Sequence, residues 1–240
     1  MALFGLFGKK SEADILAKHA EKVANKRAQA VDRWEAIRAL GHMATPEAAE
    51  GLLARFTFYV DPSITDQEEK DAAFDAIVGA GEAAVEPVAK FLAKAESISW
   101  PVKMLDKLLE PELVIGKLLE LLGTMHIEYE RDPQRKIQLL ATLEERSDPR
   151  IAGAVARFLE DANETVRFNA VGALYAQEDA EDHQAALIDA LCQEESVRVR
   201  NRILERFAES GWKVAERADD VRGKLPGGFS LAKDGSLKKR

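Results

Sequence analysis

A helical register that recurs along the chain constrains its fold more than any other feature. Around Arg167, apolar residues stand one position before and three, four and seven positions after it. These offsets lie on one face of an α-helix. The offsets of three, four and seven recur at spacings of 31 to 37 residues, centred on Arg33, Lys70, Pro101, Lys136, Arg167 and Arg200. The sequence therefore predicts a chain built from one repeated helical unit.

Helix-capping residues support these register positions. Four residues before each centre stand Gln29, Asp66, Ser97, Asp132, Asn163 and Ser196. Five of them carry a short, oxygen-bearing side chain that can accept hydrogen bonds from the free N–H groups of a first helical turn. Shorter amphipathic stretches alternate with these helices, at 11–24, 46–56, 82–95, 111–123, 148–160 and 181–193. A unit of helix, turn and helix with this period is typical of helical solenoids.

Residues 148–174, "DPRIAGAVARFLEDANETVRFNAVGAL", resemble the bacterial HEAT repeats of the phycobilisome-lyase type. Asp161 stands in the turn of this stretch, and Val166 and Arg167 open its second helix. The resemblance extends over residues 27 to 210 and is weakest at 97–125, where Pro101 replaces the basic residue. It implies an α-solenoid with a binding or scaffolding role, and it does not imply bilin lyase chemistry.

The resemblance also implies a polar ladder, in which a turn Asp pairs with a helix Arg of stacked units. Its expected members here are Asp161, Arg167 and Arg200. Asp161 is the expected partner of Arg167, with Glu195 and Glu164 as the other candidates. The predicted fold is thus all-α, a right-handed solenoid of about six HEAT-like helix pairs.

The chain ends differ from this repetitive body, which is predicted to span residues 11–225. Residues 1–10, "MALFGLFGKK", form an apolar and basic leader that is expected to be a flexible or docking terminus, with insertion into a membrane interface as the alternative. Residues 226–240 form a basic tail in which Asp234 and Gly235 stand between short alternating arms. That pattern is a β-hairpin signal, and an ordered hairpin and a frayed tail are expected equally.

The charge distribution disfavours a nucleic-acid-binding body. The net charge is −8, and the two ends hold six bases and one acid, which leaves 28 bases and 41 acids in the body. A phosphate-binding surface needs the opposite balance. The single cysteine, Cys192, excludes an internal disulfide and favours a cytoplasmic location.

The sequence predicts no catalytic, cofactor or metal site. The four histidines have no spacing typical of metal ligands, and Cys192 follows an apolar helix face, as a structural thiol does. The stretch "GAG" at 79–81 follows a helical pattern and is interpreted as a turn between helices. The chain is therefore expected to be a non-enzyme.

A row of outward-facing positions on the second helices is the predicted binding surface. The residues two, five and nine places after each centre comprise seven acids and three bases, so the row is either an acidic-leaning protein-binding face or simply solvated. Together with flanking aromatic residues, the candidate contact residues are Trp34, Glu35, Arg38, Lys103, Asp106, Gln138, Phe168, Asn169, Arg202 and Glu205. The predicted function is a monomeric adaptor for another protein, with no nucleic acid as partner. The alternatives are a helical-repeat DNA glycosylase-like protein and a membrane-peripheral adaptor that uses the leader.

Overall fold

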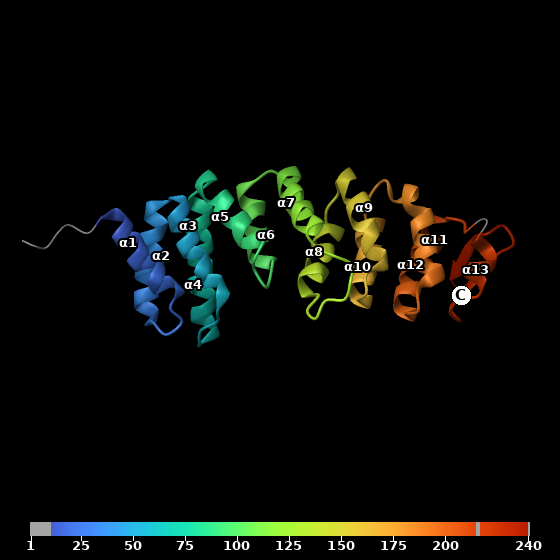
Figure 1. Ribbon diagram of the computed structural model, residues 1–240, viewed down its shortest axis with the longest axis horizontal. Helices are drawn as coiled ribbons and strands as arrows, with labels where there is room; N and C mark the ends of the chain where they lie inside the picture. Colours follow the sequence, from blue (N-terminus) through green and yellow to red (C-terminus); the bar gives the residue numbers. More distant parts are fainter. Residues whose placement is uncertain (1–10, 215–216, 240) are drawn as a thin grey trace, which may run out of the picture. The chain divides into compact units, whose positions relative to one another are not determined.

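The computed structural model describes residues 11–214 and 217–239, and these are mostly helical (Figure 1). The prediction for the leader at 1–10 falls outside the described residues. The chain divides into two compact units, Met1–Val114 and Ile115–Arg240. Within the described residues, no helix combines the length and the apolar character that a membrane crossing would need.

The first unit consists of helices that pack in two layers. Its elements are α1 (Glu12–Ala24), α2 (Ala30–Met43), α3 (Pro46–Leu53), η1 (Ala54–Thr57), α4 (Ser63–Gly79), α5 (Glu82–Leu92) and α6 (Ser99–Leu108). Helix α1 packs on α3 and α3 packs on α5, while α2 packs on α4 and α4 on α6. The odd and even helices therefore form separate layers, and contacts of α1 with α2 and of α5 with α6 join them.

The second unit continues the alternation of helices. Its elements are α8 (Gln134–Glu144), α9 (Pro149–Val155), η2 (Ala156–Glu160), α10 (Glu164–Tyr175), η3 (Ala180–His183), α11 (Gln184–Gln193), α12 (Val197–Ser210), α13 (Ala218–Arg222), β1 (Phe229–Leu231) and β2 (Leu237–Lys239). Helix α7 (Pro111–Gly123) contains the boundary between the units. Helix α10 is central, because it packs on α8, on α9 and on α12.

The predicted register is confirmed in every even-numbered helix from α2 to α12. Each register centre lies in one of these helices. The residues three, four and seven places after the centres are buried, except Phe74 and Leu108, which are partly exposed. The buried set begins with Ala36, Ile37 and Leu40 in α2 and ends with Ile203, Leu204 and Phe207 in α12. Hydrophobic periodicity therefore gave the correct core face of these helices.

The predicted caps are confirmed only in the second unit. Asn163 caps α10 through bonds from the N–H groups of the first turn, and Ser196 caps α12 in the same way. The cap at Asp66 was wrong, because α4 begins at Ser63 and so includes Asp66 in its first turn. Asp132 stands one residue before the N-cap of α8 and still accepts a bond from the first helical N–H.

The last predicted cap, Ser97, stands one residue before the N-cap of α6, and its Oγ accepts a bond from the first helical N–H, of Ser99, over 3.5 Å. Gln29, which is not one of the five predicted caps, is the N-cap residue of α2 and makes no side-chain cap bond. A backbone carbonyl or solvent can satisfy the free N–H groups of a first turn, so a helix start does not require a capping side chain.

The C-terminal tail forms the predicted hairpin. Strands β1 and β2 pair antiparallel, with Leu231 opposite Leu237, and Gly235 takes a positive φ of 80° in the connection. Phe229 and Leu237 are buried, and β2 packs on α12. The hairpin is therefore stabilised by its packing against α12. An isolated two-stranded hairpin needs such packing to be stable.

Candidate functional site

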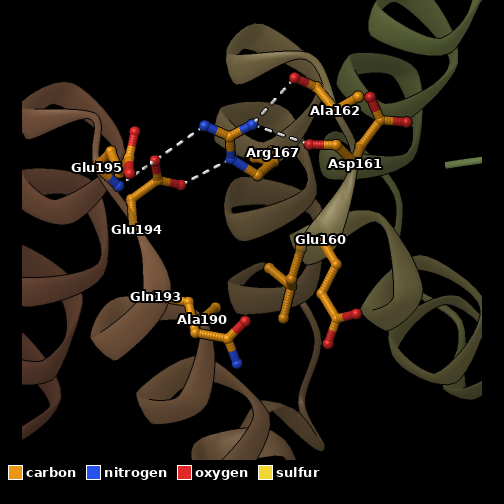
Figure 2. Close-up of a pocket in the computed structure, with 9 residues that line it drawn as sticks. Glu160, Asp161, Ala162, Arg167, Ala190, Gln193, Glu194 and Glu195 are labelled. Atoms are coloured by element: carbon orange, nitrogen blue, oxygen red, sulfur yellow. Dashed lines mark hydrogen bonds and ion pairs between the residues drawn. The ribbon is translucent and has the colours of Figure 1, made fainter. Parts of the chain in front are cut away.

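Buried basic side chains at the register centres form a ladder of ion pairs in the second unit. Lys136 Nζ donates to Asp161 Oδ2 over 2.8 Å, and both side chains are almost completely buried. Arg167 binds both carboxylate oxygens of Glu194, with distances of 2.7 Å from Nε to Oε2 and 2.8 Å from Nη2 to Oε1 (Figure 2). Two parallel charge-assisted bonds fix the planar guanidinium in this orientation.

The expected partner of Arg167 was wrong. Asp161 offers Arg167 only its backbone carbonyl, 2.8 Å from Nη1, because its carboxylate is bound to Lys136. Lys136 and Arg167 each bind an acid that stands 25 or 27 residues later in the chain. That acid lies in the turn between the two helices of the following helix pair. Asp161 and Glu194 both stand directly after the first helix of such a pair. That shared position was visible in the repeat and could have identified Glu194.

The surroundings of Arg167 indicate a structural pair. Burial works to raise the pKa of Glu194, but bonds from Arg167 and from the N–H groups of Ser196 and Glu195 bring it below its usual value. Figure 2 shows the hollow of about 340 Å³ beside this pair, which Glu160, Gln193 and Glu195 also line. Since the Arg167 guanidinium is already bound to carboxylate and carbonyl oxygens, the hollow offers a ligand mainly acidic groups.

Arg200 does not continue the ladder. Its Nε is buried without a hydrogen bond, and among residues 11–214 and 217–239 no carboxylate pairs with it. The expectation that it acts like Arg167 is therefore not met in the described residues. Helix α12 is followed by α13 and the hairpin instead of another pair of long helices.

The first unit holds a larger network of buried charges. Glu69 binds Arg33 through both carboxylate oxygens, at 2.9 and 3.0 Å, and also binds Arg55 Nε at 2.7 Å. Asp66 binds Arg55 Nη2 at 2.8 Å and Lys70 Nζ at 2.7 Å. Burial works to raise the pKa of Asp66, but the bonds from Lys70 and Arg55 bring it below its usual value. The network joins α2, η1 and α4, and its buried side chains leave no open position for a ligand.

The predicted contact residues of the first unit do not gather around a described hollow. The Arg38 guanidinium lies 5.7 Å from the centre of the partly exposed Trp34 ring. Lys103 Nζ lies 5.3 Å from the centre of the Trp100 ring. The exposed candidates Glu35 and Asp106 stand on α2 and α6, whose intervening neighbour is α4.

In the second unit, Phe168, Arg202 and Glu205 line one open hollow of about 750 Å³ at α10 and α12. We call it the arginine hollow, and its full lining is Phe168, Val197, Arg198, Asn201, Arg202, Glu205, Arg206 and Glu209. Of the other candidates, Asn169 bonds the Thr165 carbonyl within α10, at 2.8 Å. Gln138 lies on α8 and does not line the hollow.

Sequence reasoning missed two arginines of the hollow. Arg198 and Arg206 stand four residues before and after Arg202, and side chains at this spacing share one face of a helix. The offsets used to define the outward row skip both positions. The four-residue spacing of the arginines in "SVRVRNRILERF" was the signal that could have found them.

Phe168 lies between two guanidinium groups. The Cζ atom of Arg198 is 3.8 Å from the ring centre, and that of Arg202 is 4.0 Å away. The negative face of an aromatic ring attracts cations at this distance. Arg202 Nη1 also donates to the Phe168 carbonyl over 2.9 Å. The ring and the two guanidinium groups thus form a stacked platform on one side of the hollow.

Arg202 also reaches across α10 to α8. Its Nη2 donates to Glu144 Oε1 over 2.5 Å, and the pair passes over Gly172. A Cβ atom at Gly172 would lie 1.9 Å from Nη2 and 2.4 Å from the other Glu144 oxygen. Only glycine leaves room for this contact at its present position. The ion pair therefore connects α12 to α8 over α10.

The acids at the arginine hollow are bound to bases. Glu205 pairs with Lys239 of the hairpin at 2.6 Å, and Glu209 pairs with Arg206 at 3.2 Å. Arg198 is less tightly bound, because its nearest carboxylate oxygen, on Glu164, is 3.9 Å away. The Arg198 side chain is 51% exposed. It is the guanidinium of the hollow that is most open to an incoming anion.

Comparison with known proteins adds no further evidence on this site. No model of a protein family matches the chain, and a search of curated proteins finds no match either. In the part of the chain that the structure describes, no group of three or more His, Cys, Asp or Glu side chains could hold a metal ion. The pKa of Cys192 is raised by burial, which opposes formation of a nucleophilic thiolate.

Proposed function

We propose that this chain is a non-enzymatic adaptor that binds another protein through the arginine hollow. In this proposal the helix pairs form one right-handed α-solenoid of about six HEAT-like repeats. The observation that carries it is the Phe168 ring between Arg198 and Arg202, beside the exposed Val197. Aromatic and arginine side chains supply much of the binding energy at protein interfaces.

A protein fits this hollow better than a nucleic acid does. Three arginines and two glutamates of α12 line the hollow, so positive and negative groups are interspersed. A nucleic acid backbone repeats the same negative charge and would meet both glutamates. A protein segment can place an acid, a base and an apolar group in turn against such a lining. This mixed lining supports the adaptor over the glycosylase-like alternative.

The proposed adaptor works as a monomer in the cytoplasm. The single Cys192 supports a reducing compartment, since no disulfide can form within the chain. The membrane-peripheral alternative depends on the leader at 1–10, which is outside the described residues. The arginine hollow gives the adaptor proposal a site at which it can be tested.

Selection of peptides from a random display library against the full chain tests the proposed function. The recovered peptides are then measured against the chain, against Arg198→Glu and against Arg222→Glu. Arg222 is an exposed arginine outside the hollow and is therefore the matched control. We expect binding to Arg198→Glu to be weaker by about tenfold or more, and binding to Arg222→Glu to be unchanged.

Two outcomes would contradict the proposed function. One is a selection that recovers no peptide, or only peptides that bind all three proteins equally. The other is tight, salt-sensitive binding of a duplex oligonucleotide that Arg198→Glu abolishes, which would favour the glycosylase-like alternative.

A further inference from the structure

Arg202 already holds a carboxylate at the arginine hollow. That carboxylate belongs to Glu144 of α8, whose sequence position is 58 residues from Arg202. The Glu144 side chain is 30% exposed, and that of Arg202 is 15% exposed. Water and an incoming group can therefore reach the Glu144 carboxylate of this pair, unlike the almost completely buried Lys136–Asp161 pair. A partly exposed ion pair contributes only modestly to stability, so another carboxylate can compete for the same guanidinium.

We propose that Glu144 occupies the place of a partner's carboxylate, and that an acidic segment of the partner protein displaces Glu144 from Arg202. This inference rests on the proposed function and names the chemistry of the partner at that site. Glu144 then acts as an intramolecular competitor, which lowers the affinity of the free chain for acidic segments.

The position of Arg202 does not depend on Glu144 alone. Arg202 Nη1 remains bound to the Phe168 carbonyl, and its guanidinium remains stacked against the Phe168 ring. The guanidinium thus stays in place when Glu144 leaves, and its Nη2 becomes free for a new acceptor. Arg198 stacks on the same ring, and in the part of the chain that the structure describes its nearest carboxylate oxygen is 3.9 Å away. Two neighbouring guanidinium groups are therefore available to carboxylates of one segment.

Gly172 gives the carboxylate at Arg202 its room above α10. The Glu144–Arg202 pair passes directly over this residue, where a side chain would collide with both groups. Departure of Glu144 frees the space on its side of Gly172, while the Arg202 guanidinium stays over the glycine. The place that Glu144 vacates can thus take a carboxylate of the partner without a collision with α10.

The lining favours carboxylates carried on side chains over a charged phosphodiester backbone. Glu205 and Glu209 also face the hollow, and their own cations, Lys239 and Arg206, neutralise them only locally. An acidic peptide can direct its carboxylates to Arg198 and Arg202 and keep its uncharged backbone near these glutamates. A phosphodiester backbone carries a charge at every link and cannot avoid them.

Fluorescence polarisation with a labelled octaglutamate peptide tests this inference. The full chain is compared with Glu144→Gln and with Glu145→Gln at low salt. Glu145 is the exposed neighbour and makes neither of the Arg202 contacts, so its variant changes the net charge equally and leaves the pair intact. We expect octaglutamate to bind Glu144→Gln about threefold to tenfold tighter than the chain, and Glu145→Gln to bind like the chain.

The competition would be refuted if the two glutamate variants bound octaglutamate equally. It would also be refuted if octaglutamate bound none of the proteins, or if a labelled oligothymidylate bound Glu144→Gln better than octaglutamate did. These results leave the peptide selection untouched. Failure of the proposed function is shown separately, when the selected peptides do not depend on Arg198.

Discussion

The charged clusters of the two units use the same kind of residue in different ways. In the first unit, Glu69 binds both Arg33 and Arg55 and is completely buried. In the second unit, Asp161 is also completely buried but has one basic partner, Lys136. The Arg167 side chain of the next pair is 20% exposed. Burial and sharing of the acid therefore both decrease from the first cluster to the last.

This difference shows what a buried acid contributes when it has two basic partners. Removing the shared Glu69 takes a carboxylate from two buried cations at once, and only Arg55 keeps another, Asp66. Removing one member of a single pair leaves one charge, and water can solvate it where the pair is partly exposed. The penalty for an uncompensated charge grows with its burial. The first unit should therefore be more sensitive than the second to the loss of one acid.

The largest effect is expected for Glu69→Gln. This change keeps the size of the side chain but leaves Arg33 buried without a carboxylate, and it leaves Arg55 with Asp66 alone. We expect the free energy of unfolding to fall by about 4–5 kcal/mol. Urea unfolding measures it, and Glu68→Gln, at an exposed neighbouring position, should change it by less than about 0.5 kcal/mol. Equal losses for the two variants would show that the network does not stabilise the first unit.

A smaller loss is expected for Lys136→Met. The apolar side chain fills much of the same space but leaves the Asp161 carboxylate buried without its cation. Asp161 keeps the bond from the Asn163 N–H, so we expect a loss of about 3 kcal/mol. Urea unfolding of Lys233→Met, an exposed lysine of the hairpin connection, is the control. A loss larger than that of Glu69→Gln would reverse the comparison between the two units.

Arg167→Ala should cost less again, about 2 kcal/mol, because water can partly solvate Glu194 after the change. Arg200→Ala should cost only about 1 kcal/mol, because no carboxylate among the described residues pairs with it. Asn169→Ala removes a single bond to the Thr165 carbonyl and should stay within about 0.5 kcal/mol. Urea unfolding of the three variants measures the three losses of unfolding free energy. A larger loss for Arg200→Ala than for Arg167→Ala would contradict the expected order.

The smallest effect is the pH dependence from Asp66 and Glu194. Both have a lowered pKa in the folded chain, so their stabilisation is present above the ordinary values of 3.8 and 4.5. It is lost as the pH falls through the lowered values, because the unfolded chain then binds more protons. Unfolding free energies measured between pH 7 and pH 3 should fall more steeply for the chain than for Glu194→Gln. Parallel curves would show that the Glu194 pair does not contribute to acid sensitivity.

The helices and their core faces could be predicted from the sequence, whereas several helix starts could not. The register at Ala36, Ile37 and Leu40 repeats because a helix must bury one face, and that periodicity is a local property. Asp66 looked like a cap because it stands four residues before Lys70. Its carboxylate instead binds Arg55 and Lys70, and α4 begins three residues earlier, at Ser63.

The sequence by itself determined the alternation of helices, their buried faces and the hairpin turn at Asp234 and Gly235. These depend on side-chain periodicity and on backbone preferences within a few residues. Only the tertiary structure decided which acid each base meets and which outward residues share a hollow. Arg167 binds Glu194, and Arg202 crosses Gly172 to reach Glu144, because packing brings helices far apart in the sequence into contact. Such contacts depend on the distance between helices, and no local sequence pattern predicts that distance.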